Sequence, residues 1–208
     1  MILVGQYDSP YTRRVAISLR VLGIPYEHDT RSVFGDFRSM LGTNPLGRIP
    51  SLILDDGTVL IDSAAILDWI DETAGPGRAL LPPSGAARRE ALQRIALANG
   101  AVDKIGGGRN YEILIRPPRY RWPEWIERTT TQGLGALRAL DARDWPGGGR
   151  IDQAQITTAC AFDYVKVTAP ELAPEGRFAA LDRLWKRLAA MPEFVETGFS
   201  DYNVPRGE

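Results

Sequence analysis

The first part of the chain alternates between apolar runs of strand length and a helical spacing of apolar residues. The short apolar runs that predict strands are residues 2–6, 26–30, 51–54 and 58–61. Residues 10–22 carry apolar side chains at helical spacing, with Ser9 as the N-cap and Pro10 at the first helical position. A second helix follows the last strand and is capped by Asp62 or Ser63. The pattern therefore predicts a βαβ unit followed by a ββα unit.

A stretch rich in proline and glycine, residues 78–86, forms a predicted linker after a first domain at residues 1–77. Beyond it the apolar spacing is helical, which predicts an all-α domain at residues 87–208 and an α+β fold class. The apolar face of the first helix there is expected to hold Leu92, Ile95, Asn99 and Val102. Asp152 and Gln155 form a variant of the capping box at the start of a later helix.

A second run of glycine and proline, residues 106–118, is expected to interrupt a helical region without marking a domain boundary.

Composition and charge narrow the possible functions. The formal net charge is −1, so the chain lacks the basic field with which proteins attract nucleic acid, and we expect no nucleic-acid partner. The N-terminus lacks the pattern of a signal peptide, and no apolar run has the length of a membrane span, so we expect a cytoplasmic protein with no membrane partner. One cysteine, Cys160, excludes an internal disulfide, and with His28 as the one histidine, a Cys/His metal cluster or a Ser-His-Asp triad is hard to assemble. We expect no metal.

Three stretches together resemble the cytosolic glutathione transferase family, in particular its bacterial serine-type members. They are YDSPYTRRVAISLRVLGIPYE from Tyr7, NPLGRIP from Asn44, and IDSAAILDWI from Ile61. The last two are similar to the family's NP-x-G-x-[VI]-P and [EQD]-S-x-A-I-x-x-Y-[LI] segments. The resemblance implies a thioredoxin-like N-terminal domain, a helical-bundle C-terminal domain, glutathione as co-substrate and a homodimer.

The resemblance also implies roles for the residues in these motifs. The bond between Ile49 and Pro50 is expected to be cis, which would turn the main chain of Ile49 outward to pair with the cysteinyl backbone of glutathione. Asp62 and Ser63, at a helix start, match the γ-glutamyl end, which carries both an ammonium and a carboxylate. Arg48 is either a partner of the glycyl carboxylate or a solvated surface arginine.

Ser9 is the candidate donor to the glutathione thiolate, because its distance from the Gly23 helix end and its neighbourhood match the serine-type classes. A serine there would orient and stabilise the thiolate rather than ionise itself. Tyr7 is the alternative donor, since other classes use a tyrosine near this place, and Tyr11 lies near the position where another class has cysteine. The sequence leaves the choice between Ser9 and Tyr7 open.

By the same resemblance the electrophile pocket would be lined by the first helices of the second domain, where the candidates are Arg109, Tyr111, Tyr120 and Trp122. Asn99 is similar in position to a residue that in some classes reaches the glutathione of the partner subunit. The function expected is conjugation of glutathione to a small apolar or aromatic electrophile in detoxification. The alternatives are a glutathione-dependent isomerase, a peroxidase or reductase, or a non-catalytic binding or dimerisation module.

Overall fold

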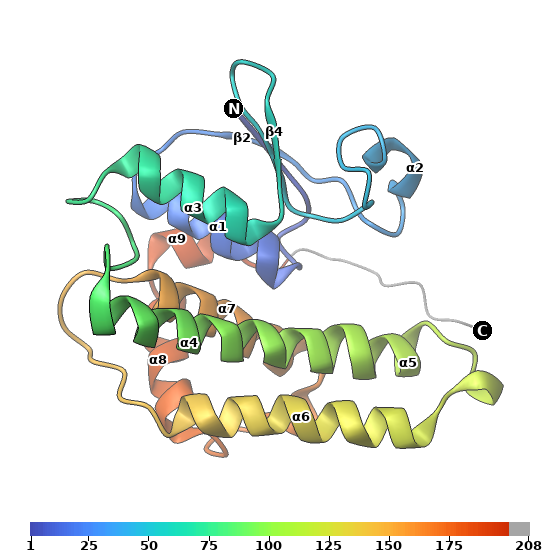
Figure 1. The fold of residues 1–208 in the computed structure, drawn as a ribbon. Helices are drawn as coiled ribbons and strands as arrows, with labels where there is room; N and C mark the ends of the chain where they lie inside the picture. Colours follow the sequence, from blue (N-terminus) through green and yellow to red (C-terminus); the bar gives the residue numbers. More distant parts are fainter. Residues whose placement is uncertain (200–208) are drawn as a thin grey trace. The chain divides into compact units, whose positions relative to one another are not determined.

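The computed structural model describes residues 1–199. Contacts within the chain divide these residues into two compact units (Figure 1). The first unit joins Met1–Gly85 to residues 191–199, and the second is Ala86–Ala190. No helix within the described part of the chain is both long and apolar enough to cross a membrane.

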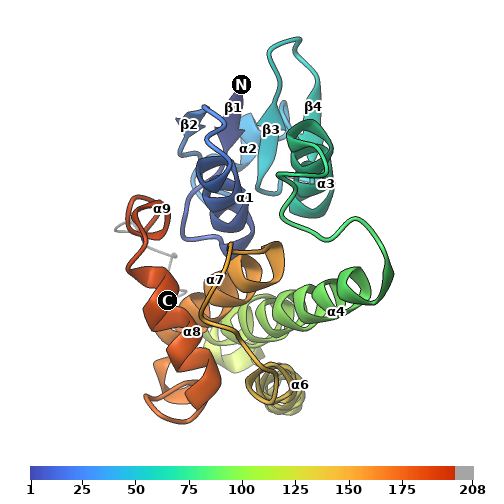
Figure 2. The same cartoon turned by 90° about the vertical axis from the view of Figure 1, so that its left-hand side faces the viewer.

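A four-stranded sheet forms the centre of the first unit. Its strands are β1 (Ile2–Val4), β2 (Glu27–Asp29), β3 (Ser51–Ile53) and β4 (Val59–Ile61), in the order β2-β1-β3-β4 (Figure 2). β2 runs parallel to β1, whereas β1 with β3 and β3 with β4 are antiparallel. This is the thioredoxin-like topology, and each strand lies within a run that the sequence predicts.

Helices α1 (Pro10–Val21) and α3 (Ser63–Ala74) pack side by side in the first unit (Figures 1 and 2), and the short α2 (Phe37–Met40) precedes β3. Val15, Ile17 and Leu19 of α1 are fully buried, and since positions two residues apart lie on opposite sides of a helix, burial of α1 is not confined to one face.

The last described helix, α9 (Pro192–Val195), packs on α1 within the first unit. The buried side chain of Arg13 donates through Nη2 to the carbonyl oxygen of Phe194 at 3.1 Å, and its guanidinium lies 5.8 Å from the centre of the Phe194 ring. We predicted a helical domain that continues to residue 208, so this segment differs from the prediction. A four-residue helix carries too weak an amphipathic pattern to show which core it joins.

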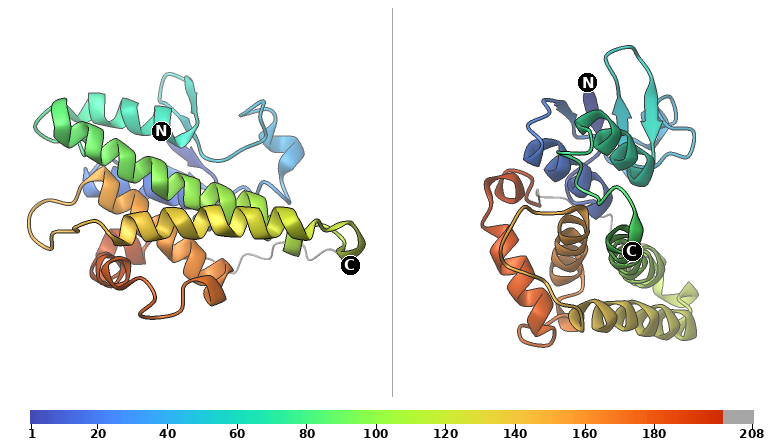
Figure 3. Two further views of the ribbon diagram at one scale, coloured as in Figure 1. Left: turned by 60° about the horizontal axis from the view of Figure 1, so that its bottom comes forward. Right: turned by 60° about the vertical axis from the view of Figure 1, so that its left-hand side comes forward.

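The second unit is helical (Figure 3). Its long helices are α4 (Gly85–Val102), α6 (Pro123–Asp141), α7 (Gln153–Thr168) and α8 (Ala179–Ala189). The shorter elements are η1 (Asp103–Asn110), α5 (Tyr111–Leu114), η2 (Pro118–Tyr120) and η3 (Pro170–Leu172). The capping box at the start of α7 is confirmed, because Asp152 Oδ1 accepts from the backbone N–H of Gln155 at 2.8 Å and Gln155 Oε1 accepts from that of Asp152 at 3.1 Å.

The glycine triplet 106–108 does not interrupt the helical region, contrary to our prediction. It lies inside η1, a π-helix that continues α4 directly into α5, and the helical path ends only near Ile115. A Cβ on Gly106 would lie 2.7 Å from the Tyr164 hydroxyl, and one on Gly108 would lie 2.7 Å from the Thr129 methyl. The glycines therefore permit close contact with α7 and α6 rather than a break.

The predicted core face of α4 is also wrong in part. Leu92 is 42% exposed, while the buried positions include Ala91, Ala98 and Ala101. The buried face of α4 is thus formed largely by alanine, while the larger Leu92 lies on the exposed side.

Gly5, directly after β1, is the tightest point of the first unit. Its φ is +132°, and a Cβ there would lie 2.7 Å from Ile49 Cβ and 2.8 Å from Thr12 Oγ1. Its N–H donates to the carbonyl of Asp29 at 2.8 Å. Only glycine fits this conformation without displacing its neighbours.

We expect Gly5→Ala to lower the free energy of unfolding by about 2 kcal/mol or more, because it adds both a forbidden φ and a steric clash. Gly57→Ala is the matched control, since Gly57 has φ +86° but open space around its Cβ position. Urea unfolding of both variants separates the two contributions. Equal losses would show that the contacts of Gly5 with Ile49 and Thr12 carry no cost.

Gly108→Ala should lower the stability of the second unit, because its Cβ would clash with the Thr129 methyl group. Gly107 has open space around its Cβ position and no positive φ, so Gly107→Ala should leave the stability unchanged or raise it by about 0.5–1 kcal/mol. Thermal unfolding of the two neighbouring variants measures this difference. Equal effects at both positions would contradict the close packing of η1.

Candidate functional site

Ser9 caps the N-terminus of α1. Its Oγ accepts from the backbone N–H of Thr12 at 3.4 Å, which is long for such a bond, and its side chain is half-buried. The first turn of α1 carries no acidic side chain. The positive end of the helix dipole is therefore not offset within that turn, and the hydroxyl lies where an anion is favoured.

The Ile49–Pro50 bond is cis, as the resemblance implied. Ile49 is half-buried and its side chain lies against Gly5. Asn44 Nδ2 donates to the carbonyl of Arg48 at 2.8 Å, which fixes the main chain just before this bond, while the Arg48 side chain is exposed.

Asp62 is the N-cap of α3, and its carboxylate accepts from the backbone N–H of Ala64 at 2.8 Å. It is the one described residue other than glycine with a positive φ, at 70°. Non-glycine residues in this region store strain that clusters at functional sites. The next side chain, Ser63, is buried, and its Oγ accepts from Arg14 Nη2 at 2.6 Å and from Arg14 Nε at 3.2 Å.

Through α1 the structure brings three predicted segments together. Thr12 Oγ1 and Ile49 Cβ both lie within 2.8 Å of the position that a Cβ on Gly5 would occupy. Arg14 donates hydrogen bonds to Ser63 at the start of α3. The sequence motifs assign no binding role to Arg14, Thr12 or Gly5. Ser9 and Thr12 are three residues apart, about one helical turn, so they lie on the same face of α1. This spacing is the feature of the sequence that could have indicated Thr12.

Tyr7 is engaged elsewhere in the first unit. Its hydroxyl is hydrogen-bonded to that of Tyr26 at 2.8 Å, and its ring stacks on His28 with centroids 3.9 Å apart. Arg20 Nε donates to the same Tyr26 hydroxyl at 3.1 Å. Burial, followed by the hydrogen bond with Tyr26, raises the pKa of Tyr7 well above its ordinary value. Tyr11 is half-buried, with the Arg14 guanidinium 5.8 Å from its ring centre.

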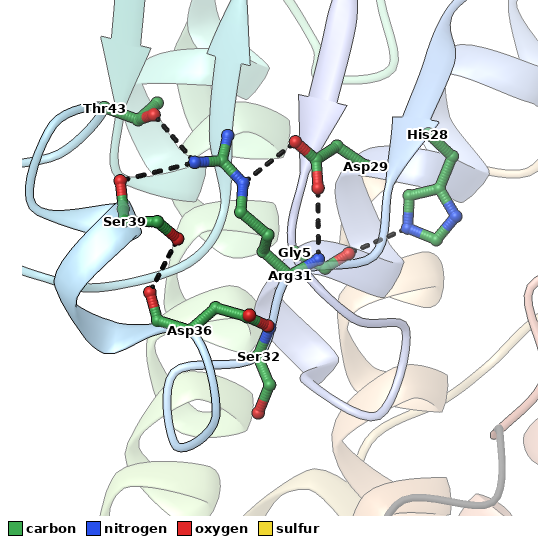
Figure 4. A network of polar contacts seen from close by, with 8 residues as sticks. All are labelled: Gly5, His28, Asp29, Arg31, Ser32, Asp36, Ser39 and Thr43. Carbon is green, nitrogen blue, oxygen red and sulfur yellow. Dashed lines mark hydrogen bonds and ion pairs between the residues drawn. The ribbon is translucent and has the colours of Figure 1, made fainter.

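A polar network holds the segment between β2 and α2 (Figure 4). Arg31 Nε donates to Asp29 at 2.9 Å, and its Nη1 donates to the Thr43 hydroxyl at 3.2 Å. The His28 Nε2 atom is 2.8 Å from the carbonyl oxygen of Gly5. The network thus ties this segment to the end of β1, where Gly5 lies.

The remaining predicted residues belong to the second unit. Arg109 in η1 forms an ion pair with Glu171 at 2.5 Å and donates to Asn110 Oδ1 at 2.8 Å. Tyr111 and Tyr120 are exposed, and Asn99 in α4 is half-buried.

The residues of the candidate site include no cysteine that could act as a nucleophile. Cys160 is buried in α7, and the first unit contains no cysteine. Within residues 1–199, no group of three or more His, Cys, Asp or Glu side chains is arranged to hold a metal ion.

Residues 3–79 match the family model described as the glutathione S-transferase N-terminal domain. The chain is 32% identical over 168 residues to the GST-like protein YibF of Escherichia coli K12, a match that covers 79% of this chain and 82% of YibF. It is 26% identical over 203 residues to the maleylacetoacetate isomerase of Pseudomonas aeruginosa, covering 94% and 91% of the two chains.

A solved structure of a glutathione transferase family member from Pseudomonas fluorescens Pf-5, with bound glutathione, superimposes with a TM-score of 0.84. The two chains share 29% identity, and the match covers 96% of this chain and 98% of the other. Sequence and fold agree along nearly the whole length, so this chain belongs to the glutathione S-transferase family of enzymes.

Proposed function

We propose that this enzyme binds glutathione in its first unit and uses the Ser9 hydroxyl to stabilise the thiolate, which then attacks a small electrophile. The observation that carries the proposal is the placement of Ser9 at the N-cap of α1, where its Oγ accepts only one long hydrogen bond, from Thr12, among the bonds described. A hydroxyl held that weakly can turn to donate to a new acceptor. The solved relative from Pseudomonas fluorescens supports glutathione as the co-substrate.

The energetics of this step are sufficient without a histidine or a metal. A free thiol has a pKa near 8.5, and lowering it by about two units requires roughly 2.7 kcal/mol of preferential thiolate stabilisation. A hydroxyl that donates to a charged acceptor contributes about 1.5–3 kcal/mol, and a helix N-terminus adds about 0.3–1 kcal/mol. The two contributions together reach the required value.

The rest of the proposed glutathione site consists of main-chain groups and three side chains. The outward main-chain groups of Ile49, before Pro50, would pair with the cysteinyl residue as an added strand does. Asp62 would accept from the γ-glutamyl ammonium, and the backbone N–H and hydroxyl of Ser63 would donate to its carboxylate. Ser63 Oγ already accepts from Arg14, so its hydroxyl proton is directed away from that guanidinium. Arg48, exposed, is the proposed partner of the glycyl carboxylate.

Ser9 is a better thiolate donor than Tyr7. The Tyr7 hydroxyl is already bonded to Tyr26, and its ring is fixed on His28. Moving this hydroxyl to a sulfur atom would break the bond and the stacking together, whereas Ser9 needs only a rotation about one bond. We therefore propose a packing role for Tyr7.

The electrophile is proposed to meet residues of the second unit, namely Arg109, Tyr111, Tyr120 and Asn99. The exposed rings of Tyr111 and Tyr120 suit a planar apolar group. Tyr11 of the first unit is the further candidate. A homodimer, a cytoplasmic location and a part in detoxification remain predictions.

The second candidate activity is glutathione-dependent isomerisation, favoured by the match to the maleylacetoacetate isomerase. It would use the same thiolate, which adds reversibly to a carbon–carbon double bond so that the bond can rotate. A cysteine-dependent reductase is disfavoured because the first unit has no cysteine.

Ser9→Ala should raise the pKa of the bound glutathione thiol by about one to two units toward its free value, which lowers the thiolate fraction and turnover by roughly threefold to 25-fold near pH 7. The loss of the cap should cost only about 1 kcal/mol of stability. Ultraviolet titration of the thiolate on the enzyme measures the pKa, and turnover is followed with an aryl halide and, separately, a cis-enone.

Tyr7→Phe is the control for this assignment. It removes the other candidate hydroxyl but retains the ring on His28. We expect a thiol pKa like that of the wild type. If Tyr7→Phe rather than Ser9→Ala abolished the thiolate, the assignment of the donor would be wrong.

A further inference from the structure

Thr12 carries a buried hydroxyl that the proposed reaction does not use. Its side chain is 0% exposed, and its Oγ1 finds no hydrogen-bond partner among residues 1–199. Buried polar groups are nearly always paired, so an unpaired hydroxyl in a core calls for a reason. A valine of almost the same shape would fill the position without that cost.

The location of this hydroxyl supplies the reason. Thr12 follows Ser9 by one helical turn, on the same face of α1, and helical side chains point back toward the helix N-terminus. Its own N–H already reaches Ser9 Oγ at 3.4 Å. The Oγ1 atom also lies 2.8 Å from the Cβ position of Gly5, beside Ile49. The unpaired donor thus lies among the segments that would surround the sulfur.

This inference rests on the proposed function. We propose that Thr12 is a positioning residue, whose hydroxyl donates to Ser9 Oγ once glutathione is bound, so that the Ser9 proton is held toward the sulfur. The thiol proton leaves to water, and both hydroxyls keep their own protons. No covalent bond forms or breaks at either residue.

A role through Ser9 fits the burial of Thr12 better than direct contact with the sulfur does. The Thr12 hydroxyl is shielded from solvent, so a ligand at the surface of the unit cannot touch it, whereas the half-buried Ser9 can be reached. Hydrogen bonds in a chain polarise one another, so a donor to Ser9 Oγ strengthens the bond that Ser9 makes to the thiolate.

The test compares Thr12→Val, which removes the hydroxyl and retains the shape, with Thr12→Ser, which retains the hydroxyl. Thr158→Val is the matched control, because Thr158 in α7 is 1% exposed and its Oγ1 is likewise unpaired among the residues that the structure describes. For each variant, ultraviolet titration gives the pKa of the bound thiol. The pH profile of kcat/KM for the electrophile, measured at saturating glutathione, gives the same pKa kinetically. Thermal unfolding gives Tm.

We expect Thr12→Val to raise the bound thiol pKa by about one unit, which lowers the thiolate fraction roughly threefold at pH 7, with Tm unchanged or higher. Thr12→Ser and Thr158→Val should both retain the wild-type pKa. Should Thr12→Val fail to fold, Thr12→Ala replaces it and is compared with Thr12→Ser, since these two differ only in the hydroxyl.

A wild-type thiol pKa in Thr12→Val, or in Thr12→Ala when that variant is used, together with a raised pKa in Ser9→Ala, would overturn the role of Thr12 and leave the proposed function intact. A bound thiol in the wild type with the pKa of free glutathione would instead overturn the proposed function, and the role of Thr12 with it.

Discussion

The close approach of three chain segments at Gly5 is the constraint on which the first unit depends. The end of β1, the first turn of α1 and the residue before Pro50 meet where a single added carbon would lie within 2.8 Å of both Thr12 and Ile49. The carbonyl of the same residue lies 2.8 Å from His28 Nε2. A side chain at this point would displace the first turn of α1 or Ile49, and the proposed glutathione site uses both.

Buried polar contacts and close backbone packing occur in both units, and one example from each unit shows what they do. In the first, buried polar side chains connect the elements: Arg14 joins α1 to Ser63, and Arg13 joins it to Phe194. In the second, small residues such as Gly106 and Gly108 let η1 contact α7 and α6 closely. Polar connections fix the directions of the side chains that they join, whereas close backbone packing requires glycine where the elements meet.

Much of the fold could be predicted from the sequence, because local chemistry determined it. Ser9 and Pro10 begin α1, a turn at Gly57 joins β3 to β4, and Asp152 with Gln155 caps α7. The thioredoxin-like topology, however, came from the resemblance, since strand order is a long-range property that short apolar runs do not encode.

What the sequence could not predict depends on contacts between distant residues. The bond from Arg14 to Ser63 spans 49 positions, and nothing near either residue indicates it. The exposure of Leu92 depends on which face of α4 the rest of the chain covers, and that face carries Ala91, Ala98 and Ala101. Within the site, the position of Ser9 was predictable from its role as a cap, but the unpaired hydroxyl of Thr12 appears only once Gly5 and Ile49 are placed around it.

The position of α9 has a consequence for how the chain folds during synthesis. Domains generally fold as units while the chain leaves the ribosome, N-terminal parts first. Here all four strands of the first unit lie before Gly85, yet the carbonyl and ring that cover Arg13 belong to Phe194. The first unit is therefore completed only after the second has been synthesised, and a nascent chain cannot close the first unit fully until Phe194 has been translated.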